Sequence, residues 1–457
     1  MINLQSLISF NDMTKQSLFT LSKQVPGEYR ANFLHLYLDI AWFGVLSGSA
    51  IAFVGVFAAR QGANALQIGL LNAGPAVVNL MVTMPASKWL QSRPISRSVF
   101  WTAVFNRIFY LAWIFLPSLL LPQGQIWALI TLTMLMSVPG TGLAVGFNAL
   151  FAGAVPLEWR GYVAGLRNAL LAMVYILVSL LCGWLLNRLP FPLGYQVVFG
   201  LGFLGAAMST VHLWFVRPHN ESDTLSHTPS HTTRRRNLTG PGTFRTLGDS
   251  QRQAVGLRFF TRVTDWRNLL QVSVVNGRYG QIIATLFFFH FTQFLAIPLF
   301  PLYWVNNLHL TDQNIGWGTA LFYTSVLLGS TQLARLTERF GNYRLLVTGA
   351  IIMSLYPGLT AMSRALPLYL FTSVVGGIAW SLVGGVIANY LLENIPEDNR
   401  PAHLAWYNLA LNAAILLGSL GGPAISAQLG LVTTLSLIAA ARFLAAMLIL
   451  TKGREAA

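Results

Sequence analysis

Twelve long apolar stretches constrain this chain more than any other feature. Each approaches or exceeds the roughly 20 residues that an α-helix needs to cross a bilayer. The stretches are continuous, whereas the strands of a membrane β-barrel alternate apolar and polar residues. The sequence therefore predicts an all-α membrane protein with twelve transmembrane helices, at residues 32–59, 67–90, 98–121, 125–152, 162–187, 194–216, 280–305, 313–336, 343–363, 366–393, 402–425 and 427–451.

Composition agrees with this class. Of the 457 residues, 54% are hydrophobic and 9% are charged, and the mean hydropathy is +0.57. A soluble domain carries about 25% charged residues, so this chain has too few to cover a water-facing surface. The single cysteine, Cys182, excludes intrachain disulfides and cysteine-based metal clusters. The sequence shows no metal-ligand spacing, phosphate-binding loop or nucleophile motif, so we expect neither a cofactor nor enzymatic activity.

Polar segments divide the chain into four parts. Residues 1–31 lack the compact apolar core of a cleavable signal peptide, and they form either a helix on the membrane surface or a flexible tail. Residues 217–279 are rich in Ser, Thr, His and Arg, which is typical of a solvated linker. Residues 32–216 and 280–457 are then predicted to form two bundles of six helices each.

Basic residues gather on one side of the predicted membrane. That side holds 24 Lys and Arg, and the opposite side holds three: Arg60, Arg188 and Arg364. Because loops rich in Lys and Arg stay in the cytoplasm, we expect a multi-pass protein of the plasma (inner) membrane with both termini and the linker cytoplasmic. These loops also explain the net charge of +15. The expected partners are the lipid bilayer and a small-molecule substrate, with no nucleic acid, and the expected state is a monomer.

Two short motifs occur twice. The sequence QIG at residues 67–69 returns as NIG at 314–316, at the starts of spans 2 and 8. Three residues of the loops before spans 5 and 11 also recur, 240 positions apart: Pro156, Arg160 and Asn168 as Pro396, Arg400 and Asn408. The two halves are therefore predicted to be pseudo-symmetric parallel repeats. In carriers of this design the substrate site lies between repeats that rock against each other.

The segment GSTQLARLTERFGNYRLL, which begins at Gly329, resembles a signature of the major facilitator superfamily. The resemblance covers residues 32–451 and implies the twelve-helix fold of that family. It also implies a charge cluster that locks one conformation. We assign to this gating group Glu338, Arg339, Gly341 and Arg344, together with Arg160 and Arg400 of the repeated loops.

The corresponding segment of the first half departs from the signature. In ASKWLQSRPISRSVF, Gln91 stands where the acid belongs, while Arg93 and Arg97 remain. Any charge relay is therefore expected mainly in the second half. Span 5 carries only Gly183 of the glycine signature that drug antiporters of the family share, so the sequence does not support that subfamily.

Asp39 is the only acid well inside any predicted span. A charge at that depth costs about 2.5–3.5 kcal/mol on insertion scales, so it is a functional candidate. His35 and Trp42 share its helical face. Two interpretations stay open. Asp39 takes and releases a proton that drives transport, with His35 tuning or relaying it, or Asp39 pairs permanently with Arg107 of span 3.

Other polar residues inside spans are candidates for a substrate cavity. The resemblance implies that span 7 lines the cavity together with span 1, which favours His290 and Gln293, although a structural role for His290 stays open. Pro298 and Pro301 are expected to bend or break span 7. The remaining cavity candidates lie in spans 1, 4 and 10: Trp42, Asn148, Trp380 and Asn389.

Three further patterns concern packing. Arg442 in span 12 is expected to form an intramembrane ion pair, and Glu393 is its best candidate partner. Asn168 and Asn408 are expected to hydrogen-bond between helices. Small residues that recur every four positions let helices approach closely, and they lie in spans 4 and 10: Gly142 and Gly146, then Gly377, Ser381 and Gly385.

These features favour a secondary active transporter that moves a small organic solute by alternating access, with proton coupling at Asp39. Because the spans hold few charges and many aromatic residues, we expect an amphipathic or weakly charged solute. The resemblance to the superfamily favours export. Two other functions stay open. One is an uncoupled facilitator, and the other is a membrane assembly factor that transports nothing, as in some members of the superfamily.

Overall fold

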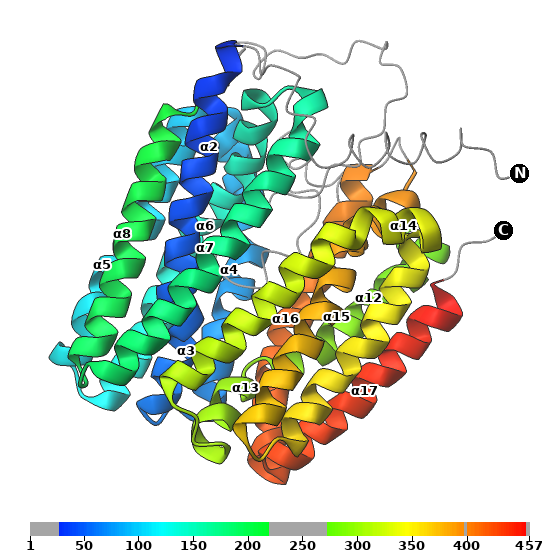
Figure 1. The fold of residues 1–457 in the computed structure, drawn as a ribbon. Coiled ribbons are helices and arrows are strands. Elements are labelled where there is room, and N and C mark those ends of the chain that lie inside the picture. The colour runs from blue at the N-terminus through cyan, green and yellow to red at the C-terminus, as the bar shows by residue number, and fades with distance from the viewer. Residues whose placement is uncertain (1–26, 219–271, 397–399, 454–457) are drawn as a thin grey trace, which may run out of the picture.

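Long helices make up most of the described chain. The computed structural model describes residues 27–218, 272–396 and 400–453 (Figure 1). The predicted N-terminal segment and linker therefore lie mostly outside the described residues. Within the described part, eleven helices are long and apolar enough to cross a membrane.

One of these helices accounts for two predicted spans. α14 (Asp312–Met362) has 51 residues, which would measure about 77 Å if straight, against a hydrocarbon core of about 30 Å. The helix is broken at Gly341, whose φ of 77° lies in the region that favours glycine. The prediction of twelve spans is confirmed, with spans 8 and 9 joined at this glycine.

The first half contains six spans. Span 1 consists of α2 (Gly27–Leu46), a π-helical turn η1 (Ser47–Ile51) and α3 (Ala52–Arg60). It begins at Gly27 rather than at 32, and Glu28 in its first turn suits the positive end of the helix dipole. The other spans are α4 (Ala65–Gln91), α5 (Ile95–Leu119), α6 (Pro122–Ala154), α7 (Arg160–Arg188) and α8 (Leu193–Phe215).

The second half repeats this arrangement. Its first span consists of α12 (Arg278–Ala296), α13 (Leu299–Leu302) and a π-helical turn η5 (Tyr303–Asn307). The break after Ala296 falls at Pro298, as predicted, because proline has no N–H to donate to the helix. The second half continues with the two parts of α14 and with α15 (Leu366–Glu393), α16 (Arg400–Leu429) and α17 (Leu431–Lys452).

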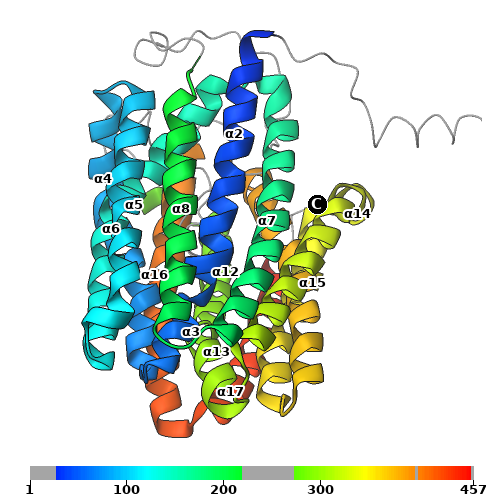
Figure 2. The same cartoon turned by 60° about the vertical axis from the view of Figure 1, so that its left-hand side comes forward.

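The helices form two bundles, α2–α8 and α12–α17, that stand side by side (Figures 1 and 2). We call the end at which α2 begins and α17 ends the terminal face, and the opposite end the far face. Between the bundles, α7 contacts α14 and α4 contacts α16. The ribbons of α7 and α14 lie close near the far face and draw apart towards the terminal face (Figure 1).

The small residues predicted to allow close packing do so within each half. A Cβ atom added at Gly146 would lie 2.9 Å from Val99 of α5, and one added at Gly377 would lie 2.7 Å from Ser325 of α14. Side chains on the outer surface are apolar and exposed, as a lipid-facing surface requires. Examples are Leu121, Met81 and Met362.

Candidate functional site

A cavity lies between the two bundles. Its volume is about 360 Å³, which falls in the range of about 300–1,000 Å³ that is usual for small-molecule sites. Both halves contribute to its wall. The lining residues with polar or aromatic side chains are Asn72, Tyr110, Trp113, Thr133, Ser137, Tyr175, Gln293, Phe294, Phe300, Trp304, Thr319, Phe322, Tyr323, Tyr356, Tyr369, Ser373, Trp380 and Arg442.

Irregular turns in spans 1 and 7 shape this cavity. Ile51 of the π-turn η1 lines it directly, and so do Ile297 and Pro301 beside the break in span 7. π-turns inside helices occur often at functional sites because they displace side chains from the regular helical register. The predicted break of span 7 at its prolines therefore helps to shape the cavity wall.

Two of the six predicted cavity residues line the cavity, and four do not. Gln293 and Trp380 belong to the lining. Within the described chain, the lining does not include Trp42, Asn148, His290 or Asn389. His290 is buried in the second bundle, where its Nε2 lies 3.1 Å from Tyr407 Oη. This contact agrees with the structural alternative for His290.

Asp39 lies inside the first bundle and not in the cavity lining. Its Oδ2 atom lies 3.4 Å from Nη2 of Arg167 in α7, and Ser209 of α8 donates a hydrogen bond of 2.5 Å to Oδ1. Asp39 is 0% and Arg167 is 1% exposed. The predicted partner is thus corrected: the ion pair that the structure shows joins Asp39 to Arg167.

Arg107 lies in the same bundle and has other partners. Its Nη1 donates to Thr210 Oγ1 at 2.6 Å and to the Ala206 carbonyl at 3.0 Å. Among the described residues, Arg107 has no carboxylate within ion-pair distance. It therefore ties α5 to α8 by hydrogen bonds.

His35 contacts a second histidine. Its Nδ1 lies 3.2 Å from Nδ1 of His212 in α8, and its ring stacks on Phe215. Since Ser209 and His212 are three residues apart on α8 and Asp39 and His35 are four apart on α2, the two polar contacts form adjacent layers of one interface. The histidine pair is the layer nearer the terminal face.

Arg442 reaches the cavity wall from the middle of α17. Its guanidinium donates to the carbonyls of Met353, Thr292 and Gln293 at 3.0–3.2 Å. The Met353 carbonyl is available because residue 357, four positions on, is a proline without an N–H. The predicted pair with Glu393 is corrected, because Arg442 has no carboxylate within ion-pair distance among the described residues. Glu393 instead accepts a hydrogen bond of 2.5 Å from Asn342.

The repeated QIG and NIG motifs both start a helix and contact the opposite bundle. The residue three positions before each motif caps the helix: Asn64 accepts from the Gln67 N–H, and Thr311 accepts from the Asn314 N–H. The glycine of each motif then faces the other bundle. This double role explains why the motif occurs twice.

The two glycine contacts are related by the repeat. Gly69 on α4 packs on α16, where a Cβ would meet the Ser419 carbonyl and lie 2.9 Å from Pro423. Gly316 on α14 packs on α7, where a Cβ would lie 2.9 Å from the Ser179 carbonyl. Ser179 and Ser419 are 240 positions apart, in the register of the repeated Asn168 and Asn408. Both contacts lie in the halves of the helices nearer the far face.

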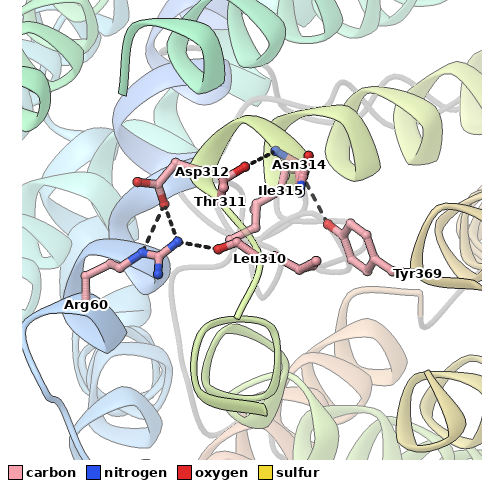
Figure 3. A network of polar contacts seen from close by, with 7 residues as sticks. All are labelled: Arg60, Leu310, Thr311, Asp312, Asn314, Ile315 and Tyr369. Atoms are coloured by element: carbon pink, nitrogen blue, oxygen red, sulfur yellow. Dashed lines mark hydrogen bonds and ion pairs between the residues drawn. The ribbon is translucent and has the colours of Figure 1, made fainter. Parts of the chain in front are cut away.

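An ion pair joins the bundles at the rim of the far face (Figure 3). Arg60, the last residue of α3, donates to Asp312 Oδ1 at 3.2 Å through Nη2 and at 3.3 Å through Nε. It also donates to the Leu310 carbonyl. Nearby, Tyr369 donates to the Ile315 carbonyl at 3.4 Å. The cavity is therefore closed towards the far face by the Arg60 contacts and by the two glycine contacts, all of which join the two bundles.

The predicted gating residues lie at the terminal face. Glu338, Arg339 and Arg344 are exposed there, on either side of the break at Gly341. Arg160 donates to the carbonyls of Val155 and Ala152 at the end of α6, so it terminates that helix. The Asn408 side chain donates to the Leu404 carbonyl in its own helix.

Sequence reasoning missed Arg167, Trp304 and the serines of the glycine contacts. Arg167 is one of the 24 basic residues on the predicted cytoplasmic side, yet it lies about two turns inside α7, which begins at Arg160. Its position seven residues after the repeated Arg160 was the signal available. Trp304 follows the two prolines of span 7 in sequence, and that proximity was its signal.

Comparisons with known proteins agree with this architecture. The Major Facilitator Superfamily model matches residues 282–456. Multidrug resistance protein 2 of Bacillus subtilis is 22% identical over 124 residues, which are 27% of this chain and 31% of that protein. The uncharacterized MFS-type transporter YcaD of Escherichia fergusonii is 26% identical over 71% of this chain and 72% of its own length.

A solved structure extends the likeness to nearly the whole chain. The inward-facing structure of a bacterial homologue of the iron transporter ferroportin superposes with a TM-score of 0.66 and 13% identity. It covers 95% of this chain and 100% of that one. This chain thus shares the overall fold of that structure. The match to the Major Facilitator Superfamily model lies within the second half of the chain.

Proposed function

We propose that this protein is a secondary transporter that carries a small organic solute across the membrane by alternating access. The observation that supports this most is the cavity between two repeated bundles, closed at the far face by contacts that the repeat generates twice. In such carriers the substrate site lies near mid-membrane between the repeats. Arg442 lines the cavity and lies near the middle of α17, so the cavity reaches the middle of the spans.

We further propose that transport is coupled to protons at Asp39, with His35 and His212 as the neighbouring layer. A proton on Asp39 would release Arg167 and loosen α2 from α7. Span 1, which contains α2, reaches the far-face contacts through Arg60 at its end. α7 reaches them through Gly183. The buried ion pair also supports the alternative, an uncoupled facilitator in which Asp39 and Arg167 never separate.

One double variant separates these two alternatives. Asp39→Asn with Arg167→Gln removes both charges and keeps similar shapes. Under proton coupling, the double variant loses the pH dependence of transport. If the protein is a facilitator, both the transport rate and its pH dependence stay as in the parent protein.

The direction and the orientation are also proposals. Export is supported by the name of the Bacillus subtilis relative. A plasma-membrane location with the terminal face in the cytoplasm is supported by the distribution of Lys and Arg between the two sides.

Alternating access is tested with a cysteine reporter in the cavity. Cys182 is buried, so Asn72→Cys in a Cys182→Ser background gives a single reactive thiol at the wall. An impermeant maleimide should label it from either side of membrane vesicles, and added solute should change the two rates in opposite directions. Ser92→Cys, exposed at the terminal face, is the control and should react from one side only. A reporter at position 72 that reacts from one side under every condition would contradict alternating access.

A further inference from the structure

The cavity wall holds buried hydrogen-bond donors that lack a partner in the described chain. They are Nε1 of Trp113, Nε1 of Trp304 and Nε of Arg442. Indole and guanidinium N–H groups donate and cannot accept. Because an unsatisfied buried donor is costly, a solute that brings acceptor oxygens to this wall gains more than one that brings donors.

The charge of the cavity wall also favours a solute with acceptor oxygens. Arg442 is the only charged residue of the described chain that lines the cavity, and no carboxylate lines it. The guanidinium is 2% exposed and rests on three neutral carbonyls. Those bonds use three of the five guanidinium N–H groups, and a positive charge remains without a counter-charge.

Aromatic rings form a continuous wall from the second bundle to the first. Trp304 stacks on Phe300, which meets Tyr356 edge to face at a centroid distance of 4.8 Å. Phe322 links Tyr356 to Tyr323 of α14. The ring centroid of Tyr323 lies 3.9 Å from that of Tyr175 in α7. Planar solutes gain by offset stacking and edge contacts with such rings.

On the basis of the proposed transport function, we infer that the cavity takes an aromatic solute with a single carboxylate-like oxyanion. The oxyanion docks at the Arg442 guanidinium, whose Nε–H lacks a partner in the described chain, and the indole N–H groups of the same wall are further donors to acceptor atoms of the solute. The ring packs against Phe300, Tyr356 and Trp304. Aromatic ammonium ions are excluded, because the wall offers them a cation and no carboxylate.

Three probes of equal shape and different charge test this assignment. They are naphthylacetate, naphthylacetamide and naphthylethylammonium, each titrated against the purified full-length protein in detergent while the unfolding temperature is recorded. A ligand that binds only the folded protein raises that temperature. We expect the carboxylate to bind at least about tenfold more tightly than the amide, and the ammonium ion to give no shift.

Substitutions in the cavity wall test which side chains produce the preference for the carboxylate. Arg442→Gln should weaken the carboxylate about thirtyfold and the amide much less, whereas Arg442→Lys should retain most of the preference for the carboxylate. Because Arg442 also holds three carbonyls, Trp304→Phe supplies a second test that keeps the aromatic wall. It should weaken both acceptor probes about fivefold.

The outcomes separate this inference from the proposed function. Equal binding of the three probes, or a preference for the ammonium ion, overturns the solute class while leaving a solute-binding cavity. Silence with all three probes also overturns the class. The cysteine reporter at position 72 then decides independently whether the bundles alternate. A carboxylate preference that survives Arg442→Gln unchanged would overturn the docking assignment, and so would Trp304→Phe if it left the binding of both acceptor probes unchanged.

Discussion

Contacts inside each bundle differ in kind from contacts between the bundles. Inside the first bundle, Asp39, Arg167 and Ser209 form a fully buried charged network. Between the bundles, glycines pack against backbone at the far face, and Arg60 and Asp312 pair at an exposed rim. Separating a buried ion pair costs much free energy. Separating small-residue contacts or a solvent-accessible ion pair costs less. The comparison indicates two bundles whose internal contacts are stronger than the contacts that join them.

The first prediction breaks the network inside a bundle and has the largest expected effect. Asp39→Asn leaves Arg167 buried without a carboxylate, so the free energy of unfolding should fall by about 3–5 kcal/mol. Chemical or thermal unfolding in detergent measures this fall. The matched control is the double variant with Arg167→Gln, which removes the orphaned charge and should recover most of the loss. If the single and double variants are equally unstable, the buried pair does not carry the stability assigned to it.

The second prediction concerns the glycine contacts between the bundles. Gly69→Ala or Gly316→Ala overpacks the closed far face, at a cost of about 1–3 kcal/mol, and leaves the bundles themselves intact. Labelling of the Asn72→Cys reporter from the far face should therefore rise about fivefold or more.

Gly165→Ala is the control for these variants, because a Cβ at Gly165 on α7 meets nothing within 4 Å. It should leave the labelling rate unchanged. An equal rise in all three alanine variants would show that helix propensity, and not contact at the far face, causes the change.

The third prediction has the smallest expected effect and concerns the rim. Side chains of Arg60 and Asp312 are 29% and 13% exposed, and such pairs contribute about 0.2–1 kcal/mol. Arg60→Gln should raise far-face labelling about twofold in low salt and less in high salt, because salt screens exposed charges. The charge-reversed pair, Arg60→Asp with Asp312→Arg, should restore the parent rate. If Arg60→Gln raised the far-face labelling rate more than Gly316→Ala does, the ion pair would hold the far face closed more strongly than the glycine contact.

Much of the fold could be predicted from the sequence, because a bilayer allows only helices and closed β-barrels, which satisfy their own backbone hydrogen bonds. The lengths of the apolar stretches gave the spans, and the two motifs gave the repeat. α14 is an example: the sequence separates its two spans between residues 336 and 343, and Gly341 breaks the helix within that interval.

The site was harder to predict for a physical reason. Helices that are apolar all round give no signal of which side faces a cavity, so Gln293 was found while Trp304 was not. The partner of Asp39 was also missed, since Arg167 is 128 positions away and lies on another helix. Which charge meets which is decided by the rotation and depth of two helices, and single-residue spacing does not contain that information.

The most direct test of the two-body account is a pair of distance measurements by spin labelling in lipid, on a Cys182→Ser background. Labels at Leu193 and Arg364 report the far face, and labels at Ser92 and Arg339 report the terminal face. The account predicts two distances for each pair, with the far-face distance lengthening as the terminal-face distance shortens, and Gly316→Ala enriching the long far-face distance. A single far-face distance that neither solute nor Gly316→Ala changes would contradict it.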